Sequence, residues 1–316
     1  MKNVNKKNAY FAASLYALII GFSFLFVKLA LTVTDPLNIL AHRFTISFLA
    51  ASIPIIFGWI KLDITFKDLL PILPISLFYP TLFFAFQAFG LVYISSSEAG
   101  IVQATIPIFT MILATLFLKE YSSRLQKASL ILSVSGVIYI FLMKGIDLKS
   151  ASFIGAILII LSALASSGYN VLARKITKKY KIVDLTYMMT FIGFLSFNLI
   201  SIVDHGLRGT LNVYFKPFFS PLFVVSVLYL GILSSLVTSL LSNYTLSQIE
   251  ASKMSVFSNL STLITMLAGV IFLKERLYYF HIIGAVMIIA GIIGTNFLDK
   301  KIPTNDSEEK TPKLPL

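Results

Sequence analysis

Residues 117–120 read FLKE, and residues 272–275 read FLKE again. Each copy lies between two long apolar runs: residues 116–142 read LFLKEYSSRLQKASLILSVSGVIYIFL, and residues 271–298 read IFLKERLYYFHIIGAVMIIAGIIGTNFL. The two copies lie 155 residues apart, about half the length of the 316-residue chain. This repetition predicts that the chain consists of two related halves.

The composition predicts a protein that lies in a lipid bilayer. Hydrophobic residues make up 57% of the chain, charged residues make up 13%, and the mean hydropathy is +0.87. An average soluble domain has about 25% charged residues. The net charge of +12 comes from short basic clusters between apolar runs. Such clusters are typical of membrane topology signals, so we do not expect a nucleic-acid partner.

Ten apolar runs have about the 20 residues that a helix needs to cross the hydrocarbon core. Helices are expected because each one satisfies its own backbone hydrogen bonds within one segment. The predicted fold class is an all-α integral membrane protein with ten transmembrane helices in two inverted five-helix repeats. The runs fall at residues 10–31, 37–58, 69–92, 97–118, 125–143, 153–173, 184–204, 221–245, 250–272 and 278–298.

The runs divide the chain into three predicted parts. The first five-helix repeat covers residues 10–143, and the second covers residues 153–298. Residues 299–316 are rich in Pro and in charge, so we expect a disordered tail. The connections between the runs are short, and no soluble domain is expected between them.

The basic residues predict the orientation of the chain. If the N-terminus is cytoplasmic, 18 of the 26 Lys and Arg residues lie on the cytoplasmic side, and two more lie within the apolar runs. The positive-inside rule therefore places both termini in the cytoplasm. The first run begins near Tyr10 and has full membrane length, so we do not expect a cleavable signal peptide.

An offset of 155 residues aligns small and polar residues of the fourth run with those of the ninth. Both sets follow the spacing i, i+3, i+7, i+10, i+14, which marks one narrow face of a helix. We expect this stripe to point away from lipid. Equivalent points are separated by five runs, an odd number, so the second half enters the membrane from the opposite side. The stripes consist of Gly100, Gln103, Pro107, Thr110 and Ala114, and of Ser255, Ser258, Thr262, Thr265 and Gly269.

These features resemble the EamA-type members of the drug/metabolite transporter superfamily. The resemblance covers about residues 10–298 and depends on the ten runs in two halves, on Ser95, Ala99 and Pro107 in the fourth run, on FLKE, and on the Gly-rich fifth and tenth runs. It implies a carrier that exports amino acids or other small metabolites across a bacterial plasma membrane, with a central cavity lined by runs 1, 3, 4, 6, 8 and 9. Residues 20–23 read IGFS where such transporters usually have Trp-Gly, so the resemblance implies the fold more strongly than the substrate.

Polar residues within the runs are the candidates for substrate binding. Ser and Thr residues commonly join neighbouring membrane helices, so we regard most of them as packing contacts. Larger amides are costly to leave unpaired in a dry region and have a stronger claim to a functional role. The predicted binding residues are Ser23, His42, Arg43, Tyr79, Gln87, Gln103, Tyr169, Asn170, Asn243, Ser258 and Asn259.

Two basic residues lie within the first two runs and allow two interpretations. Lys28 and Arg43 can anchor the helix ends at the outer headgroups by extending toward them. Alternatively, Arg43 faces the cavity and holds a substrate carboxylate, for which its planar fork is suited. All five acids near the runs lie at run ends, so a buried proton relay is not evident. If transport is coupled to protons, His42 or Glu98 is the candidate.

The predicted function is a secondary carrier in the plasma membrane, with a small-molecule substrate and the lipid bilayer as partners. The alternatives are a multidrug or lipophilic-cation efflux carrier, a channel and a membrane scaffold. The sequence also leaves a homodimer open. An enzyme is not expected, because the three His residues lie in different runs or loops and lack HExxH spacing. The chain has no Cys, and we expect no metal site and no cofactor.

Overall fold

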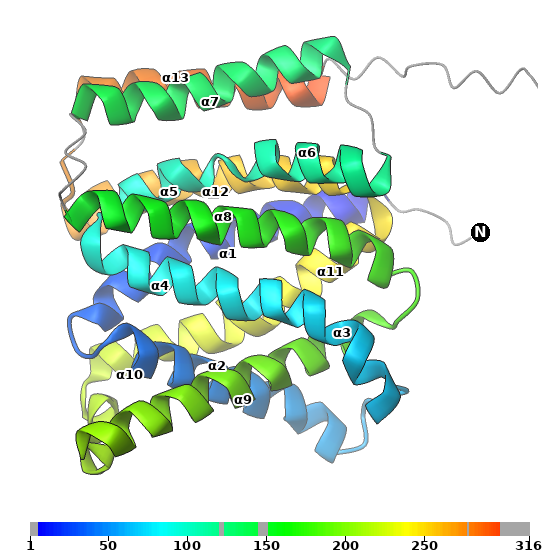
Figure 1. The fold of residues 1–316 in the computed structure, drawn as a ribbon, viewed down its shortest axis with the longest axis vertical. Coiled ribbons are helices and arrows are strands. Elements are labelled where there is room, and N and C mark those ends of the chain that lie inside the picture. Colours follow the sequence, from blue (N-terminus) through cyan, green and yellow to red (C-terminus); the bar gives the residue numbers. More distant parts are fainter. Residues whose placement is uncertain (1–5, 120–122, 145–150, 277, 298–316) are drawn as a thin grey trace, which may run out of the picture.

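The computed structural model describes residues 6–119, 123–144, 151–276 and 278–297. The regular elements of these residues are all helical, and most helices lie side by side with their long axes in similar directions (Figure 1). The α-helices are α1 (Lys6–Leu31), α2 (Pro36–Ile56), α3 (Leu69–Ser76), α4 (Phe83–Tyr93), α5 (Ser96–Gln103), α6 (Ile106–Leu118), α7 (Arg124–Lys144), α8 (Ala151–Ile176), α9 (Ile182–Arg208), α10 (Pro221–Leu228), α11 (Thr238–Gln248), α12 (Ala251–Leu273) and α13 (Tyr279–Phe297). The shorter elements are η1 (Phe66–Asp68), η2 (Leu77–Leu82), η3 (Leu211–Val213), η4 (Lys216–Phe219) and η5 (Tyr229–Val237).

Eight segments of the described residues are long and apolar enough to cross a membrane. The predicted class, an all-α integral membrane protein, is therefore confirmed. The expected fifth and tenth runs form α7 and α13, and α13 includes the shorter apolar helix Tyr279–Gly291. The count of ten membrane crossings stays a prediction. Glu120 of the first FLKE and the predicted tail 299–316 lie outside the described residues.

Three of the expected continuous helices are broken. The third is divided by the π-helical segment η2, which contains Pro80, and the eighth is divided by the π-helical segment η5. The fourth is interrupted at Ala104 and Thr105, just before Pro107 in the first turn of α6. Proline has no backbone N–H and cannot continue a regular helix, which explains the breaks beside Pro80 and Pro107. The sequence of η5 contains no proline, so the sequence gives no such signal for this break.

Several backbone features recur at the offset of 155 residues. Lys119 and Lys274 both end a helix in the left-handed conformation, at φ 57°, ψ 32° and φ 55°, ψ 33°. Ile94 and Ile249 both end the preceding helix in an extended conformation. The segments η2 and η5 also overlap when one is shifted by 155 residues. The FLKE copies are therefore part of a longer pairing of local backbone structure.

The two predicted stripes lie against each other. All ten stripe residues are buried, so the expectation that they point away from lipid is confirmed. Thr262 Oγ1 donates a hydrogen bond of 2.7 Å to the Gly100 carbonyl oxygen. A Cβ at Gly100 would lie 2.9 Å from Thr265 Cγ2, so the glycine lets α5 and α12 approach closely.

Glu275, the glutamate of the second FLKE, forms hydrogen bonds with the start of α5. The backbone N–H groups of Ser96 and Ser97 donate to the two Glu275 carboxylate oxygens over 2.8 Å and 2.9 Å. Both serine hydroxyls donate to the same carboxylate. A carboxylate at this position satisfies N–H groups that the first turn of a helix leaves unpaired. The contact joins the connection between α12 and α13 to a helix more than 170 residues earlier in the chain.

Helices α7 and α13 form a closely packed pair at one edge of the bundle (Figure 1). Gly136 and Gly284 face each other there, and a Cβ on Gly136 would lie 2.7 Å from the Gly284 carbonyl oxygen. The glycines of these two helices therefore allow close packing, as their sequence pattern suggests.

Gly269→Ala tests the Glu275 contact. A Cβ at Gly269 would collide with Glu275 Oε2 and Ser97 Oγ. We expect the variant to lose about 1–3 kcal/mol of stability, the usual cost of overpacking a tight site. Thermal unfolding of the purified protein in detergent measures this loss.

Gly206→Ala is the matched control, because Gly206 lies in α9 and a Cβ added there would have no heavy atom within 4 Å. Alanine favours a helix over glycine by up to about 1 kcal/mol, so this variant should unfold at the same temperature or slightly higher. Equal unfolding temperatures for both variants would contradict the role assigned to the Glu275 contact.

Candidate functional site

A small cavity with a mainly apolar lining lies at the place where α1, α4, α5, α6 and α12 meet. Its volume is about 10 Å³, roughly the space of one water molecule. Two predicted binding residues, Gln103 and Ser258, line it. The lining residues are Tyr16, Ile20, Phe24, Phe83, Gly100, Gln103, Ile106, Ser258, Ser261, Thr262 and Thr265.

Gln103 joins three helices beside this cavity. Its Nε2 donates to Ser162 Oγ of α8 over 3.1 Å, and Ser162 Oγ donates to the Phe83 carbonyl oxygen of α4 over 2.9 Å. On the opposite side, Thr265 Oγ1 donates to the Gly21 carbonyl oxygen of α1 over 2.9 Å. These polar groups hold neighbouring helices together, which is the packing role expected for Ser and Thr in membrane helices.

Three predicted binding residues form a continuous series of contacts, which we call the tyrosine chain. They are Tyr79, Tyr169 and Asn243. The Tyr79 and Tyr169 rings are stacked with centroids 4.6 Å apart. Tyr169 Oη donates to Asn243 Oδ1 over 3.0 Å, and Asn243 Nδ2 donates to Thr186 Oγ1 of α9 over 3.0 Å. Tyr79 Oη lies 3.4 Å from Thr238 Oγ1 of α11. The chain therefore connects the broken third helix with α8, α9 and the broken eighth helix.

Arg43 is buried inside the bundle, with 1% of its surface exposed. Its Nε donates to Ser235 Oγ over 2.7 Å, and its Nη2 donates to Ser234 Oγ over 2.8 Å and to the Ser234 carbonyl oxygen over 3.2 Å. The guanidinium carbon lies 3.7 Å from the centre of the Phe84 ring. Arg43 therefore does not extend to the headgroups, and it is not among the residues that line the small cavity.

His42 occupies a different place from the other predicted binding residues. Its Nε2 donates to the Tyr214 carbonyl oxygen over 2.9 Å, and aromatic rings of the segment that connects α9 with α10 surround it. The ring centroid of Phe218 in η4 lies 4.9 Å away. The structure thus brings His42 together with a connecting segment and not with the small cavity.

The remaining predicted residues are all buried but differ in their hydrogen bonds. Ser23 Oγ donates to the Ile20 carbonyl oxygen within its own helix, and Asn170 Nδ2 lies 3.5 Å from Thr110 Oγ1. Neither the oxygen nor the nitrogen of the Gln87 amide has a hydrogen-bond partner among the described residues, and the same holds for Asn259 Oδ1. Buried polar groups are normally paired, so Gln87 and Asn259 are candidates for contacts with a substrate.

The sequence interpretation missed Tyr16, Thr186 and Ser234. Tyr16 lines the cavity, Thr186 ends the tyrosine chain, and Ser234 binds Arg43. The sequence carries no signal for Thr186 and Ser234, because a lone hydroxyl residue in an apolar run is ordinary. The aromatic ring of Tyr16 is equally ordinary, since 42 Phe and Tyr residues occur in the chain.

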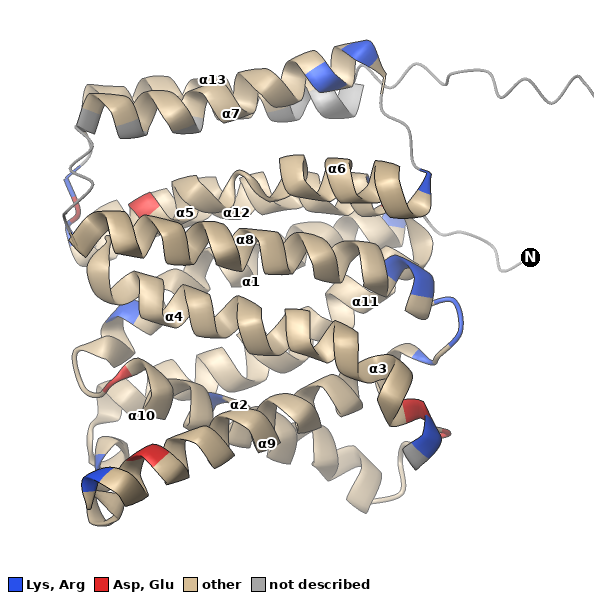
Figure 2. Cartoon of the chain, in the orientation of Figure 1, with Lys and Arg blue, Asp and Glu red and all other residues tan. Residues whose placement is uncertain are grey.

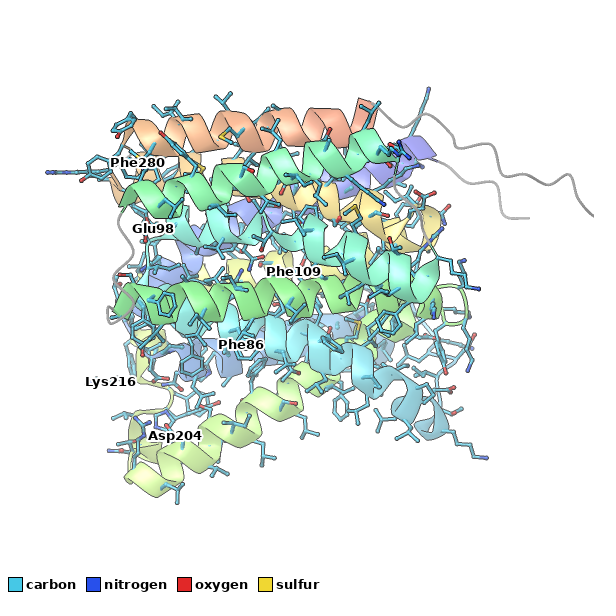
Figure 3. The ribbon with its side chains drawn as sticks, turned by 45° about the horizontal axis from the view of Figure 1, so that its top comes forward. Phe86, Glu98, Phe109, Asp204, Lys216 and Phe280 are labelled. Atoms are coloured by element: carbon cyan, nitrogen blue, oxygen red, sulfur yellow. The ribbon has the colours of Figure 1, made fainter. Side chains whose placement is uncertain are left out.

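Acidic residues lie at the ends of the bundle and not at its centre. In Figure 3, Glu98 and Asp204 lie near one end, whereas Phe86 and Phe109 lie nearer the middle of their helices. Glu98 forms a capping box with Ser95, which satisfies backbone N–H groups at the start of α5. In the described part of the chain, no group of three His, Asp or Glu side chains is arranged to hold a metal ion.

Charges at the opposite end connect the α2–α3 segment with the start of α9. Lys181 forms an ion pair with Asp63, and this carboxylate raises the Lys181 pKa above its usual value. The Thr65 hydroxyl and backbone N–H donate to Asp68, and these hydrogen bonds lower the Asp68 pKa. The Lys181–Asp63 ion pair is exposed to solvent, so it contributes little to stability.

A bundle of apolar helices around a buried polar centre defines a multi-pass membrane protein with the architecture of a transporter. The EamA-like transporter family matches residues 7–142 and 153–297. The chain therefore belongs to the EamA-like transporter family and is a membrane transporter.

Known proteins resemble the chain along most of its length. An uncharacterized transporter of Bacillus subtilis (strain 168), YcxC, is 58% identical over 294 residues, which cover 93% of this chain and 94% of that protein. An uncharacterized transporter of Archaeoglobus fulgidus is 28% identical over 275 residues, covering 86% of this chain and 92% of that protein. One solved crystal structure matches with a TM-score of 0.69 at 16% identity and covers 94% of this chain and 99% of its own, so it supports the fold alone.

Gln87→Leu tests whether the unpaired amide is costly to the fold. An unsatisfied buried polar group costs about 1–3 kcal/mol, so we expect this variant to raise the thermal unfolding temperature in detergent. Gln103→Leu is the matched control, since it removes the bond to Ser162 and should lower that temperature. A loss of stability in Gln87→Leu as large as that in Gln103→Leu would show that the Gln87 amide is satisfied within the fold.

Proposed function

We propose that the protein is a secondary carrier that exports amino acids or related small metabolites by alternating access. The observation that carries this proposal is that helices of both halves line the small cavity. Helices α1, α4, α5 and α6 of the first half line one part, and α12 of the second half lines the other. A site at the meeting point of two halves can be opened to either side when the halves rock against each other.

The proposal includes the inverted repeat, with halves at residues 10–143 and 153–298. It is supported by the paired left-handed residues Lys119 and Lys274 and by the paired breaks at η2 and η5. Broken helices at the same place in the two halves are typical of carriers, which use irregular backbone where it borders a binding site.

We further propose that the protein lies in the plasma membrane with both termini in the cytoplasm. Basic residues gather at the end of α8 and in the turn before α9, at the end of the bundle that also contains the start of α1 (Figure 2). The positive-inside rule assigns such an end to the cytoplasm.

The second candidate, efflux of lipophilic cations, is disfavoured by the charges around the polar centre. Among the described residues, the cavity lining contains no Asp or Glu, and the fully buried charge beside the tyrosine chain is the cation of Arg43. A cationic substrate would be repelled there. A catalytic role is also disfavoured, because the lining contains no His and no Cys to act as a nucleophile or base.

Counterflow in liposomes tests the carrier proposal. Purified full-length protein is reconstituted, loaded with an unlabelled compound and exposed to a trace of the same compound in labelled form. The panel contains L-leucine, L-phenylalanine, L-threonine, uridine and tetraphenylphosphonium. We expect transient accumulation of at least one amino acid and none of the cation, since a carrier exchanges its substrates through one alternating site.

Two serine substitutions accompany the counterflow measurement, one as a test of the cavity and one as its matched control. Ser258→Phe fills the cavity and should abolish accumulation, whereas Ser14→Phe adds the same ring at an exposed position of α1 and should preserve it. Flux that rises linearly with concentration and shows no counterflow would indicate a channel and overturn the proposal. Accumulation of tetraphenylphosphonium alone would favour the efflux alternative.

A further inference from the structure

The positive charge of Arg43 has no anionic partner in the described part of the chain. Its three polar partners are the Ser235 hydroxyl, the Ser234 hydroxyl and the Ser234 carbonyl group, and all of them are neutral. The ion pairs among the described residues lie elsewhere, at Lys181, Arg208 and Lys253. Buried charges are normally paired, so the Arg43 guanidinium is an exception that needs an explanation.

The hydrogen bonds of Arg43 also leave donors unused. A guanidinium group carries five N–H donors. Nε and Nη2 are bonded to the two serines, while Nη1 has no hydrogen-bond partner among the described residues. A planar guanidinium with free N–H groups binds a carboxylate more readily than other side chains do, because the geometry of the two groups matches.

Two further buried hydroxyl groups without partners lie one helical turn beyond Arg43 and Ser235. Ser47 follows Arg43 by one turn of α2, and Ser239 follows Ser235 by about one turn of the eighth helix. Neither Ser47 Oγ nor Ser239 Oγ has a hydrogen-bond partner among the described residues, and both serines are at least 97% buried.

The two helices run in the same direction, so Ser47 lies about level with Ser235, and Ser239 lies about one turn further along. The His42 ring lies near Phe223, with centroids 5.9 Å apart, and one turn later the Ile46 side chain lies against Gly231. Both chains therefore advance together from the Arg43–Ser235 contact toward Ser47 and Ser239. Arg43, Ser47, Ser235 and Ser239 are therefore buried polar residues on neighbouring turns of α2 and the eighth helix, and we call them the Arg43 cluster.

Aromatic rings connect the Arg43 cluster with the small cavity. The Phe84 ring lies under the guanidinium, the Phe83 ring lies 4.7 Å from Phe84 between centroids, and Phe83 lines the cavity. Tyr79 packs against both phenylalanines at 5.2 Å and 5.0 Å. A substrate with an acidic group at Arg43 would therefore have its remaining part along aromatic faces, which also attract an ammonium group.

We propose that the Arg43 cluster binds the carboxylate of the transported substrate, with the Arg43 cation as the anchor for this anion and the serine hydroxyls as further donors. This inference rests on the carrier proposal and adds a substrate class to it: the protein transports compounds with a carboxylate and rejects analogues that lack one. Amino acids and 2-oxo acids fulfil this condition, whereas amines and esters do not.

The test compares matched compounds that differ in the carboxylate. One set is L-leucine, 4-methyl-2-oxopentanoate, L-leucine methyl ester and 3-methylbutylamine, and the second is L-phenylalanine, phenylpyruvate, L-phenylalanine methyl ester and phenethylamine. Binding is measured as thermal stabilisation of the purified full-length protein, and transport is measured as counterflow in liposomes. In at least one set, we expect the two acids to bind at least tenfold more tightly than the ester and the amine.

Variants identify the residue responsible. Arg43→Gln should remove the preference for acids, and Arg43→Lys should retain part of it, because it keeps the charge but loses the planar fork. Arg208→Gln is the matched control at an exposed position and should behave like the wild type. The wild-type comparison does not depend on any variant, so it decides the matter even if Arg43→Gln fails to fold.

Each remaining outcome has a defined meaning. Counterflow of esters or amines as efficient as that of the acids would overturn the carboxylate site and leave the carrier proposal standing. Stabilisation by sodium chloride, without any preference among the organic compounds, would assign Arg43 to an inorganic anion and overturn the substrate class. Failure of every compound in both sets to bind or to be exchanged would overturn the amino-acid carrier proposal together with the site.

Discussion

The absence of hydrogen-bond partners in lipid is the constraint on which this structure depends. Each backbone or side-chain polar group within the membrane must find a partner inside the protein. The constraint explains the helical architecture, and it explains why the ten stripe residues of the fourth and ninth runs face each other. It also explains the contact at Glu275, whose carboxylate pairs with the N–H groups that begin α5. The FLKE repeat thus includes a residue that completes the hydrogen bonding of a distant helix.

The same constraint makes buried polar groups without hydrogen-bond partners candidates for a functional site. A charged residue at the centre of a membrane helix costs about 2.5–3.5 kcal/mol on insertion scales. Arg43 is placed there with neutral partners, next to the segment η5 where the regular helix opens. Gln87, Ser47 and Ser239 also remain without protein partners among the described residues. An unpaired cation with unpaired hydroxyl groups one helical turn away is the arrangement that we expect of a site that is completed by a ligand.

Much of the fold could be predicted from the sequence, because it depends on features of short stretches of residues. Hydrophobic run length determines where helices form, and the i, i+3, i+7 spacing of Gly100, Gln103 and Pro107 determines which face is buried. The partners of individual side chains were not predictable in this way. Arg43 binds a serine 192 residues away, and Tyr169 binds an asparagine 74 residues away. The break at η5 was also missed, because it has no proline and arises where α2 packs closely against Gly231.

The central claim is that two related halves lie upside down relative to each other, and labelling from the two faces tests it most directly. The chain contains no Cys, so Lys119→Cys and Lys274→Cys each introduce a single thiol at an exposed helix end. A membrane-impermeant maleimide is applied to intact cells and to inside-out vesicles. The account predicts that Lys274→Cys reacts only in intact cells and that Lys119→Cys reacts only in inside-out vesicles. Labelling of both variants from the same face would contradict the inverted repeat.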